Sequence, residues 1–335
     1  MINLGTAHTP SLAEILATAR VVSLPLRTRF RGLNDREVLL FEGPNGWAEW
    51  SPFVEYDDDE AAVWLASAIE FAYGDLPQLN RHRIPVNATL PAVAPELVTK
   101  TLAPFGDFRT VKIKVAEKGQ TPGIDVDRIV AVRNNFPEAK IRLDANGGWS
   151  VDLAFSFIKA LHGNGITPQY VEQPCATIAE LAQLRAKLAE ANLPVKIAAD
   201  ESIRRVSDPL EVARAGAADI IVLKAAPLGG IARALSIAEE SGLPVVVSSA
   251  LDSSVGLSMG AHLAAALPRL EFDCGLGTAA LLAGDVTREP LKPENGFIDV
   301  RRVEVDQMKL DVFKAEDHRE DWWLARLERA AAKLS

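Results

Sequence analysis

Short runs of β-branched and other apolar residues recur from about residue 84, and each is followed by a longer segment with helical apolar spacing. Such runs predict buried strands, and such segments predict amphipathic helices. Strands are expected at Ile84–Leu90, Val111–Val115, Ile141–Ala145, Tyr170–Gln173, Val195–Asp200, Ile220–Lys224, Pro244–Ser249 and Leu270–Cys274. Helices are expected at Thr121–Phe136, Val151–His162, Thr177–Ala191, Asp208–Ala215, Gly230–Glu240 and Val255–Leu267. Strands alternating with helices predict a parallel sheet with crossover helices.

Charged residues recur in phase at the ends of these strands. The positions are Lys114, Asp144, Glu172, Asp200 and Lys224, at intervals of 30, 28, 28 and 24 residues. A single charge at a strand end is usually a solvated cap, but five in phase favour one shared site. Eight strands favour a closed α/β barrel, whose active site lies at the carboxyl ends of the strands. A doubly wound open sheet is the alternative, but no Gly-x-Gly-x-x-Gly loop follows the first strand.

The two ends of the chain have a different pattern. Alternating apolar and polar residues predict strands at Ala19–Pro25, Arg36–Glu42 and Trp47–Ser51, and a terminal helix is expected at Asp321–Leu334. No regular helix is expected directly after Cys274. We therefore predict a modified TIM barrel, (β/α)7β, at residues 84–283. Residues 1–83 and the C-terminal segment 284–335 would together form an α+β capping domain.

Composition narrows the class of protein. The chain has 335 residues and a net charge of −9, which disfavours nucleic-acid binding because a binder needs a concentrated basic surface. No apolar run reaches the roughly 18–20 residues that cross a membrane, and the N-terminal residues do not resemble a secretion signal. Cys175 and Cys274 are expected to be free thiols. These features predict a cytoplasmic protein; none of them indicates an oligomeric state.

Lys112 and Lys114 lie two residues apart on an otherwise apolar strand, so their side chains point the same way. We expect that direction to be the barrel interior, where mutual repulsion and lost solvation would lower the pKa of both lysines. A lysine with a lowered pKa can act as a general base near neutral pH. An exposed lysine pair on an edge strand is the alternative.

Asp144, Glu172 and Asp200 come from successive strand ends, so their carboxylates can converge. Three hard oxygen ligands suit Mg²⁺, with Mn²⁺ as a substitute, and do not suit zinc. Asn146 projects from the same strand end as Asp144 and could hydrogen-bond the substrate or a ligand carboxylate. Glu201 is adjacent to Asp200, so we expect it to point elsewhere and to support the site from outside the ligand set.

Further residues are candidates for binding a carboxylate substrate. Lys224 follows the sixth strand and would lie across the barrel from Lys114, with the substrate between the two amines. Ser248 and Ser249 end the seventh strand and could bind a second carboxylate, or could simply terminate the strand. The basic segment 27–32 could cover the barrel mouth and offer Arg31 to the substrate, or could be a solvated turn.

These motifs together resemble the muconate-lactonising subgroup of the enolase superfamily. The resemblance rests on Lys112-x-Lys114, Asp144-x-Asn146, Val-Glu172-Gln-Pro, Ala-Asp200-Glu-Ser, Leu-Lys224 and, in the cap, Gly46-Trp-Ala-Glu-Trp-Ser-Pro52. It implies that Asp144, Glu172 and Asp200 bind Mg²⁺ and that Lys114 and Lys224 flank the substrate. The histidine base of other subgroups has no counterpart, because Ser248-Ser-Ala250 occupies its place.

Within the subgroup, the segments 27–32 and 248–256 are similar to those of a branch of hydro-lyases in menaquinone biosynthesis. This similarity implies dehydration of a succinyl-hydroxycyclohexadiene carboxylate to an aromatic acid, with Lys114 as base and then acid. The alternatives on the same scaffold are an N-succinylamino acid racemase, a dipeptide epimerase or a muconate cycloisomerase, since these also use both lysines. A non-catalytic barrel is disfavoured, because binding alone requires no base on each side of a metal.

Overall fold

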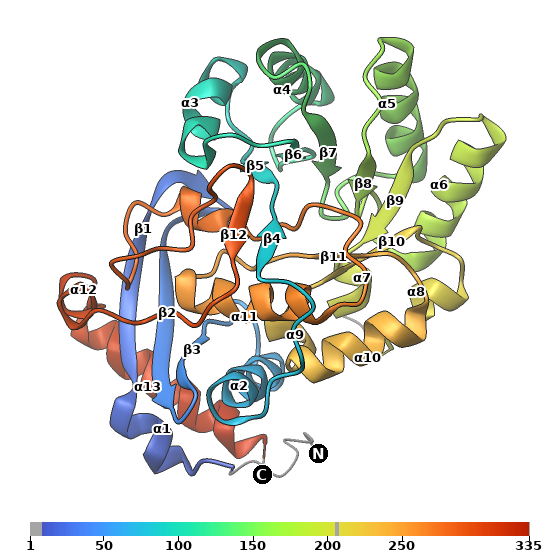
Figure 1. Ribbon diagram of the computed structural model, residues 1–335. Coiled ribbons are helices and arrows are strands. Elements are labelled where there is room, and N and C mark those ends of the chain that lie inside the picture. Colours follow the sequence, from blue (N-terminus) through green and yellow to red (C-terminus); the bar gives the residue numbers. More distant parts are fainter. Residues whose placement is uncertain (1–8, 205–207, 335) are drawn as a thin grey trace.

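The computed structural model describes residues 9–204 and 208–334, which form a parallel barrel and an α+β cap (Figure 1). The cap holds an antiparallel sheet in the order β1-β2-β3, and elements from both ends of the chain cover it. Trp50 and Trp323, from opposite ends of the chain, are both buried and meet edge to face at 5.5 Å. The main cap elements are β1 (Arg20–Phe30), β2 (Leu33–Gly43), β3 (Gly46–Trp50), α1 (Leu12–Thr18), α2 (Asp58–Tyr73), α12 (Gln307–Val312) and α13 (Asp317–Ala332).

The barrel sheet is parallel, in the order β11-β10-β9-β8-β7-β6-β5. Its strands are β5 (Ala88–Leu90), β6 (Thr110–Lys114), β7 (Lys140–Asp144), β8 (Tyr170–Glu172), β9 (Lys196–Ala199), β10 (Ile220–Leu223) and β11 (Val245–Val247). The crossover helices are α4 (Pro122–Asn135), α5 (Val151–Gly163), α6 (Ile178–Glu190), α8 (Glu211–Arg214), α10 (Ile231–Ser241) and α11 (Ser254–Ala266). Shorter elements are η1 (Pro95–Leu97), α3 (Val98–Leu102), η2 (Ala103–Phe105), α7 (Glu201–Arg204), α9 (Ala225–Leu228) and η3 (Thr278–Leu281).

Two single-residue bridges close the barrel where an eighth strand was expected. Cys274 pairs with Val86 beside β5, and Gly275 pairs with Ser248 beside β11. The predicted strand Leu270–Cys274 is therefore wrong in extent, since only its last residue pairs. A Cβ atom at Gly275 would lie 2.5 Å from Ser248 Oγ, so glycine allows the two segments to approach this closely.

Two other expectations need correction, and one helix was not expected. The run Ile84–Leu90 is divided: β4 (Arg83–Pro85) pairs with β12 (Phe297–Asp299) outside the barrel, and Pro85 lacks the N–H that a continuous central strand requires. The helix expected at Asp208–Ala215 is reduced to α8, which ends before Gly216 at φ 58°. The long helix α2 was not predicted, although Asp57 caps its first turn by accepting from the Glu60 N–H.

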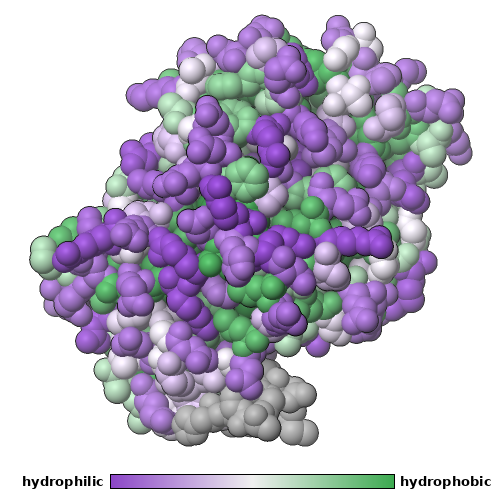
Figure 2. Space-filling model, in the orientation of Figure 1, coloured by the Kyte–Doolittle hydropathy of each residue, from purple (hydrophilic) through white to green (hydrophobic). Residues whose placement is uncertain are grey.

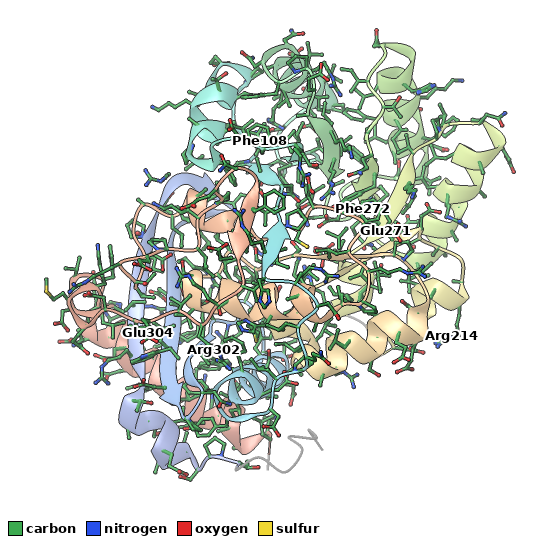
Figure 3. All side chains as sticks on the ribbon, in the orientation of Figure 1. Phe108, Arg214, Glu271, Phe272, Arg302 and Glu304 are labelled. Atoms are coloured by element: carbon green, nitrogen blue, oxygen red, sulfur yellow. The ribbon has the colours of Figure 1, made fainter. Side chains whose placement is uncertain are left out.

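Apolar and aromatic side chains fill the barrel interior beneath the strand ends. Tyr170 meets Phe272 edge to face at 6.3 Å (Figure 3 labels Phe272). Their cluster also contains Ala198, Ile220, Val222 and Val246, all at least nine-tenths buried. The interior is thus a packed core, which also holds the fully buried Arg142, whose guanidinium stacks on Tyr170 at 4.8 Å.

Hydrophilic residues cover most of the face in Figure 2, with hydrophobic residues in smaller groups between them. Among the helices described for residues 9–204 and 208–334, none has both the length and the apolar character needed to cross a bilayer. Both cysteines are free thiols and both are buried, in agreement with the sequence expectation.

Candidate active site

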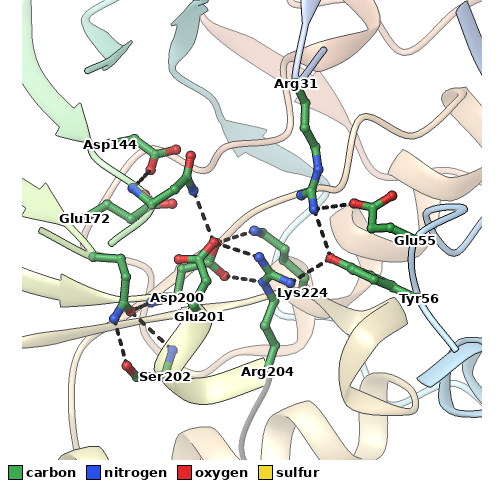
Figure 4. Close-up of polar contacts among 12 residues, drawn as sticks. Arg31, Glu55, Tyr56, Asp144, Glu172, Asp200, Glu201, Ser202, Arg204 and Lys224 are labelled. Carbon is green, nitrogen blue, oxygen red and sulfur yellow. Dashed lines mark hydrogen bonds and ion pairs between the residues drawn. The ribbon is translucent and has the colours of Figure 1, made fainter. Parts of the chain in front are cut away.

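The charged residues predicted from their spacing meet at the carboxyl end of the barrel strands. Lys114 is in register with Asp144, and Asp144 is in register with Glu172. Paired residues on parallel strands point to the same side of a sheet. Asp200 follows β9 directly and Lys224 follows β10 directly. Asp144, Glu172, Asp200 and Lys224 gather in one polar cluster (Figure 4), and Lys114 is the partner of Asp144 on the neighbouring strand.

Lys112 is buried in the barrel interior, as expected, but its role differs from the prediction. Its Nζ lies 2.8 Å from Glu172 Oε1 and 3.3 Å from Asp144 Oδ2. Burial acts to lower the pKa of Lys112, but the Glu172 and Asp144 carboxylates outweigh it and hold that pKa well above its usual value. The expectation of a lowered pKa is therefore wrong for Lys112, because neighbouring anions were not counted. Lys112 is a bound cation that bridges two carboxylates.

Asp200 is held by two cations from different elements. Its Oδ2 lies 2.6 Å from Lys224 Nζ, and its Oδ1 lies 3.2 Å from Arg204 Nε. Burial raises the pKa of the Asp200 carboxyl, but Lys224 and Arg204 prevail and lower it below its usual range. Asp200 is therefore an anion at neutral pH.

Glu172 has a carboxylate oxygen with no protein partner. Its Oε2 is buried and receives no hydrogen bond from the described residues. Burial, together with Asp144 and Asp200 nearby, raises the pKa of Glu172 to about 7. A cation bound at this oxygen would offset the cost of burying it without a partner and would reduce the repulsion between the carboxylates.

The carboxylates of Asp144, Glu172 and Asp200 are therefore the kind of ligand that a divalent cation prefers. In this structure they contact lysine and arginine side chains. Within residues 9–204 and 208–334, no three side chains of Asp, Glu, His or Cys are arranged so that they could hold a metal ion. Each of Asp144, Glu172 and Asp200 is instead paired with a lysine. Binding an ion would require these carboxylates to turn from the lysines toward it.

Glu201 does not point away from the site. Its Oε1 accepts hydrogen bonds from Asn146 Nδ2 at 3.1 Å and from Arg204 Nη2 at 2.7 Å. The expectation that it would point elsewhere is wrong, because the helix α7 begins immediately after Asp200 and turns Glu201 toward β7. The Asn146 side chain was expected to bind the substrate or a ligand carboxylate; it contacts Glu201 instead, which lies outside the predicted ligand set. Its backbone is left-handed, at φ 42°.

The two serines after β11 have different surroundings. Ser249 Oγ donates to the Gly275 carbonyl at 2.8 Å and lies 2.9 Å from the Thr278 hydroxyl. Ser248 lies two residues after the interior residue Val246, so its side chain faces the barrel axis. Ser248 is therefore the better placed of the two to face a bound molecule.

Arg31 reaches the site from the tight turn between β1 and β2. Its Nη2 lies 3.1 Å from Glu55 Oε1 and 3.1 Å from the Tyr56 hydroxyl, and its guanidinium stacks on Phe53 at 3.8 Å. The Tyr56 hydroxyl also accepts a hydrogen bond from Arg204. Figure 4 shows Arg31, Glu55 and Tyr56 on the side of the cluster opposite Asp144 and Glu172.

Sequence reasoning missed Tyr56, Arg204 and the function of Gln173. Gln173 Oε1 accepts from the Asp200 N–H at 3.1 Å, and its amide donates to Ser202 Oγ at 2.7 Å, so it fixes the start of α7. Arg204 lies one helical turn after Asp200, a spacing that places the two side chains together. That spacing is visible in the sequence, whereas the contact with Tyr56 depends on tertiary structure.

Two cavities lie near the strand ends. One of ≈350 Å³ opens beside the cluster and is lined by Asn146, Gly147, Gln173, Ala176, Thr177, Ile178, Glu201 and Ser202. A larger one of ≈560 Å³ lies between β1, α3 and η3, and none of the metal or lysine candidates lines it. None of these candidates lines the smaller cavity either, but its wall includes Asn146, Glu201 and Gln173, and Gln173 accepts a hydrogen bond from the Asp200 N–H, so the smaller cavity is the one beside the cluster.

The fold and the domain models agree on the class of protein. Residues 95–304 match the model described as "Enolase C-terminal domain-like", and residues 21–72 match "Enolase N-terminal domain-like". The chain therefore belongs to the enolase superfamily.

Its relatives include several proteins named o-succinylbenzoate synthase. The one from Mycobacterium ulcerans is 51% identical over 318 residues, covering 95% of this chain and 94% of that protein. The one from Mycolicibacterium smegmatis is 51% identical over 322 residues, covering 96% and 98%. At this identity and coverage, the chain is a member of the o-succinylbenzoate synthase family.

Solved structures with the same fold include muconate cycloisomerases. A muconate lactonizing enzyme from Pseudomonas fluorescens, complexed with muconolactone, is 21% identical with a TM-score of 0.74, covering 89% of this chain and 98% of its own. A 2-chloromuconate cycloisomerase from Rhodococcus opacus is 24% identical with a TM-score of 0.74 and the same coverage. These likenesses confirm the capped, modified TIM barrel.

Proposed function

We propose that this chain dehydrates 2-succinyl-6-hydroxy-2,4-cyclohexadiene-1-carboxylate to o-succinylbenzoate, a step of menaquinone biosynthesis. The name shared by its relatives supports the reaction, and the cluster of lysines and carboxylates supports the chemistry. The substrate is a small carboxylate. The two buried free thiols favour a reducing compartment, the cytoplasm.

Lys114 is the proposed general base. Of the two lysines on β6, Lys112 is bound to Glu172 and Asp144, whereas Lys114 forms no side-chain hydrogen bond or ion pair with the described residues. This contrast carries the assignment, because only a lysine free of a carboxylate partner can reach a substrate proton.

The dehydration balances with one lysine. Lys114 removes the proton on the ring carbon that bears the carboxylate, and the electrons of the broken C–H bond move onto the carboxylate, which becomes an enediolate. These electrons form the ring double bond only as the hydroxyl group departs. The C–O bond to the hydroxyl group then breaks, Lys114 returns a proton to that oxygen, and water leaves an aromatic ring. Lys224, at the end of β10, would stabilise the developing negative charge as a cation.

Asp144, Glu172 and Asp200 would hold a magnesium ion, for which manganese can substitute. When bound, such an ion supplies positive charge at the substrate carboxylate and favours loss of the neighbouring proton. The free oxygen of Glu172 supports this ligand set. Lys112 would keep Asp144 and Glu172 oriented, and Ser248, Ser249 and Arg31 are proposed to contact the substrate.

Turnover of the cyclohexadiene substrate, followed by ultraviolet absorbance, tests the proposal. We expect aromatic product with Mg²⁺, none with excess chelator, and a loss of kcat of at least about 10³-fold in Lys114→Ala. Lys187→Ala is the matched control, because Lys187 forms a half-exposed ion pair with Asp152 on the outside of the barrel. No dehydration by the Mg²⁺-loaded wild type would reject the proposal.

Proton exchange separates the lyase from the racemase alternative. N-succinylamino acids of each hand are incubated in D₂O with wild type, Lys114→Ala and Lys224→Ala. If each lysine exchanged the proton of a different enantiomer while dehydration stayed undetectable, the chain would be a racemase. We expect dehydration to depend on Lys114 as base and to be weakened in Lys224→Ala.

A further inference from the structure

The Tyr56 hydroxyl links three segments that are far apart in the sequence. Arg31 Nη2 lies 3.1 Å from it and Arg204 Nη1 lies 3.0 Å from it. Arg31 belongs to the β1–β2 turn, Tyr56 to the loop after β3, and Arg204 to α7 of the barrel. Tyr56 is only 5% exposed, so these contacts form with little competition from water.

Arg204 uses its remaining nitrogens on the carboxylates of the site. Its Nε lies 3.2 Å from Asp200 Oδ1, its Nη2 lies 2.7 Å from Glu201 Oε1, and its side chain is 6% exposed. All three nitrogens of one rigid plane are therefore engaged (Figure 4). Because the guanidinium is planar, its contact with Tyr56 restricts how it can hold Asp200.

The loop that carries Tyr56 is itself fixed from the cap. Arg326 of α13 donates to the carbonyl oxygens of Pro52, Phe53 and Tyr56 at 3.0, 2.9 and 2.8 Å. Arg326 is buried. A continuous set of contacts thus runs from the C-terminal helix, through Tyr56 and Arg204, to Asp200.

We propose that Tyr56 and Arg204 are a positioning pair that ties the cap loop to the orientation of the Asp200 carboxylate. Arg204 holds Oδ1, so Oδ2 is left to face Lys224 and the space where an ion would bind. The contact with the Tyr56 hydroxyl holds the Arg204 guanidinium in one orientation. Without that contact the guanidinium can rotate, and the Asp200 carboxylate can rotate with it. This inference rests on the proposed function only in giving Asp200 a metal-binding role.

Three variants and one control test the pair without substrate. Tyr56→Phe removes only the hydroxyl, Arg204→Lys keeps the charge but removes the fork, and the third variant combines both. Arg329→Gln is the control, since Arg329 pairs with Asp58 in the same cap and is 51% exposed. The readouts are the Mn²⁺ dissociation constant, from electron paramagnetic resonance, and amide hydrogen exchange of residues 52–56 in metal-free protein.

We expect the Mn²⁺ dissociation constant to rise about tenfold in Arg204→Lys and about threefold in Tyr56→Phe. The combined variant should be no weaker than Arg204→Lys alone, because the hydroxyl acts through Arg204. Exchange of residues 52–56 should be faster in all three variants and unchanged in Arg329→Gln. The proposal would be overturned if the Mn²⁺ dissociation constant of the combined variant rose by the product of the two single effects. It would also be overturned if Mn²⁺ affinity and amide exchange were both unchanged in Arg204→Lys.

The outcome is separable from that of the proposed function. Wild-type protein that fails to dehydrate the substrate, with the expected pattern in Mn²⁺ affinity and exchange, would reject the function and support the pair. Active wild type, with both readouts unchanged in the variants, would reject the pair alone.

Discussion

Glu49 Oε2 accepts a hydrogen bond from the backbone N–H of Ser253 at 3.0 Å, so a strand of the cap binds the N-terminus of a barrel helix. The same oxygen accepts from the Gly256 N–H at 3.3 Å. Ser253 is the N-cap of α11, where backbone N–H groups lack helical partners. Glu70 of α2 binds the first turn of α10 in the same way, accepting from the Ala232 N–H at 3.0 Å. Two buried glutamates therefore join the cap to helices of the barrel.

Glu49 should make stability depend on pH. Burial and then Asp252 raise the pKa of Glu49 from 4.5 to about 7. Between these values the folded state binds more protons than the unfolded state, so the free energy of unfolding falls as pH rises. Glu49→Gln stays neutral at both pH values. The difference in the free energy of unfolding between about pH 5 and about pH 7.5, measured by urea unfolding, should therefore shrink by on the order of 1–3 kcal/mol.

Glu37 provides a control, because its effect on stability should change with pH in the opposite direction. Burial raises its pKa, but hydrogen bonds from Arg319 and Trp323 prevail, and the pKa of Glu37 lies below its usual value. Its stabilising contribution is therefore lost as pH falls, and Glu37→Gln should weaken the protein more at neutral pH than at acidic pH. An unchanged pH slope in Glu49→Gln would contradict the account of Glu49.

Lys112→Met should destabilise the folded protein far more than Lys114→Met. The variant leaves Glu172 and Asp144 without their shared cation, so we expect a loss of about 3–5 kcal/mol in the free energy of unfolding. Saturating Mg²⁺ should restore part of it. In Lys114→Met, where no ion pair is broken, the loss should stay within about 1 kcal/mol. Thermal unfolding with and without Mg²⁺ measures both, and equal losses would argue against the distinction.

Metal binding should stabilise the folded protein through Glu172. At 100 times its dissociation constant, Mg²⁺ should add about 2.7 kcal/mol to the free energy of unfolding. Glu172→Gln loses a charged ligand, so the Mg²⁺-dependent rise in Tm should disappear or need much more ion. Differential scanning calorimetry with a titration of Mg²⁺ checks this, and an undiminished rise in the variant would remove Glu172 from the ligand set.

Arg326→Met should destabilise the loop that carries Tyr56. The substitution leaves three carbonyl groups of residues 52–56 without their buried donor, and we expect a loss of about 3 kcal/mol. Arg329→Gln, on the same helix but exposed, should cost less than about 1 kcal/mol. Urea unfolding of the two variants gives the comparison, and a similar small loss in both would show that the loop is held by other contacts.

Much of the fold and of the cluster follows from the sequence alone. Alternating strands and helices predict the barrel, and the in-phase positions of Asp144, Glu172 and Lys224 predict one site, because the carboxyl ends of parallel strands meet at one edge. These features depend on local periodicity, which the order of residues carries directly.

Other features were decided only by tertiary structure. The raised pKa of Lys112 reflects carboxylates on two neighbouring strands, and the link from Tyr56 to Arg204 joins residues 148 positions apart. The hydrogen bond from the Ser253 N–H to Glu49 joins residues 204 positions apart. Periodicity says which side of its own element a residue occupies, but not which distant side chain lies opposite. Burial and charge were therefore set by tertiary packing, between barrel strands for Lys112 and between cap and barrel for Tyr56 and Glu49.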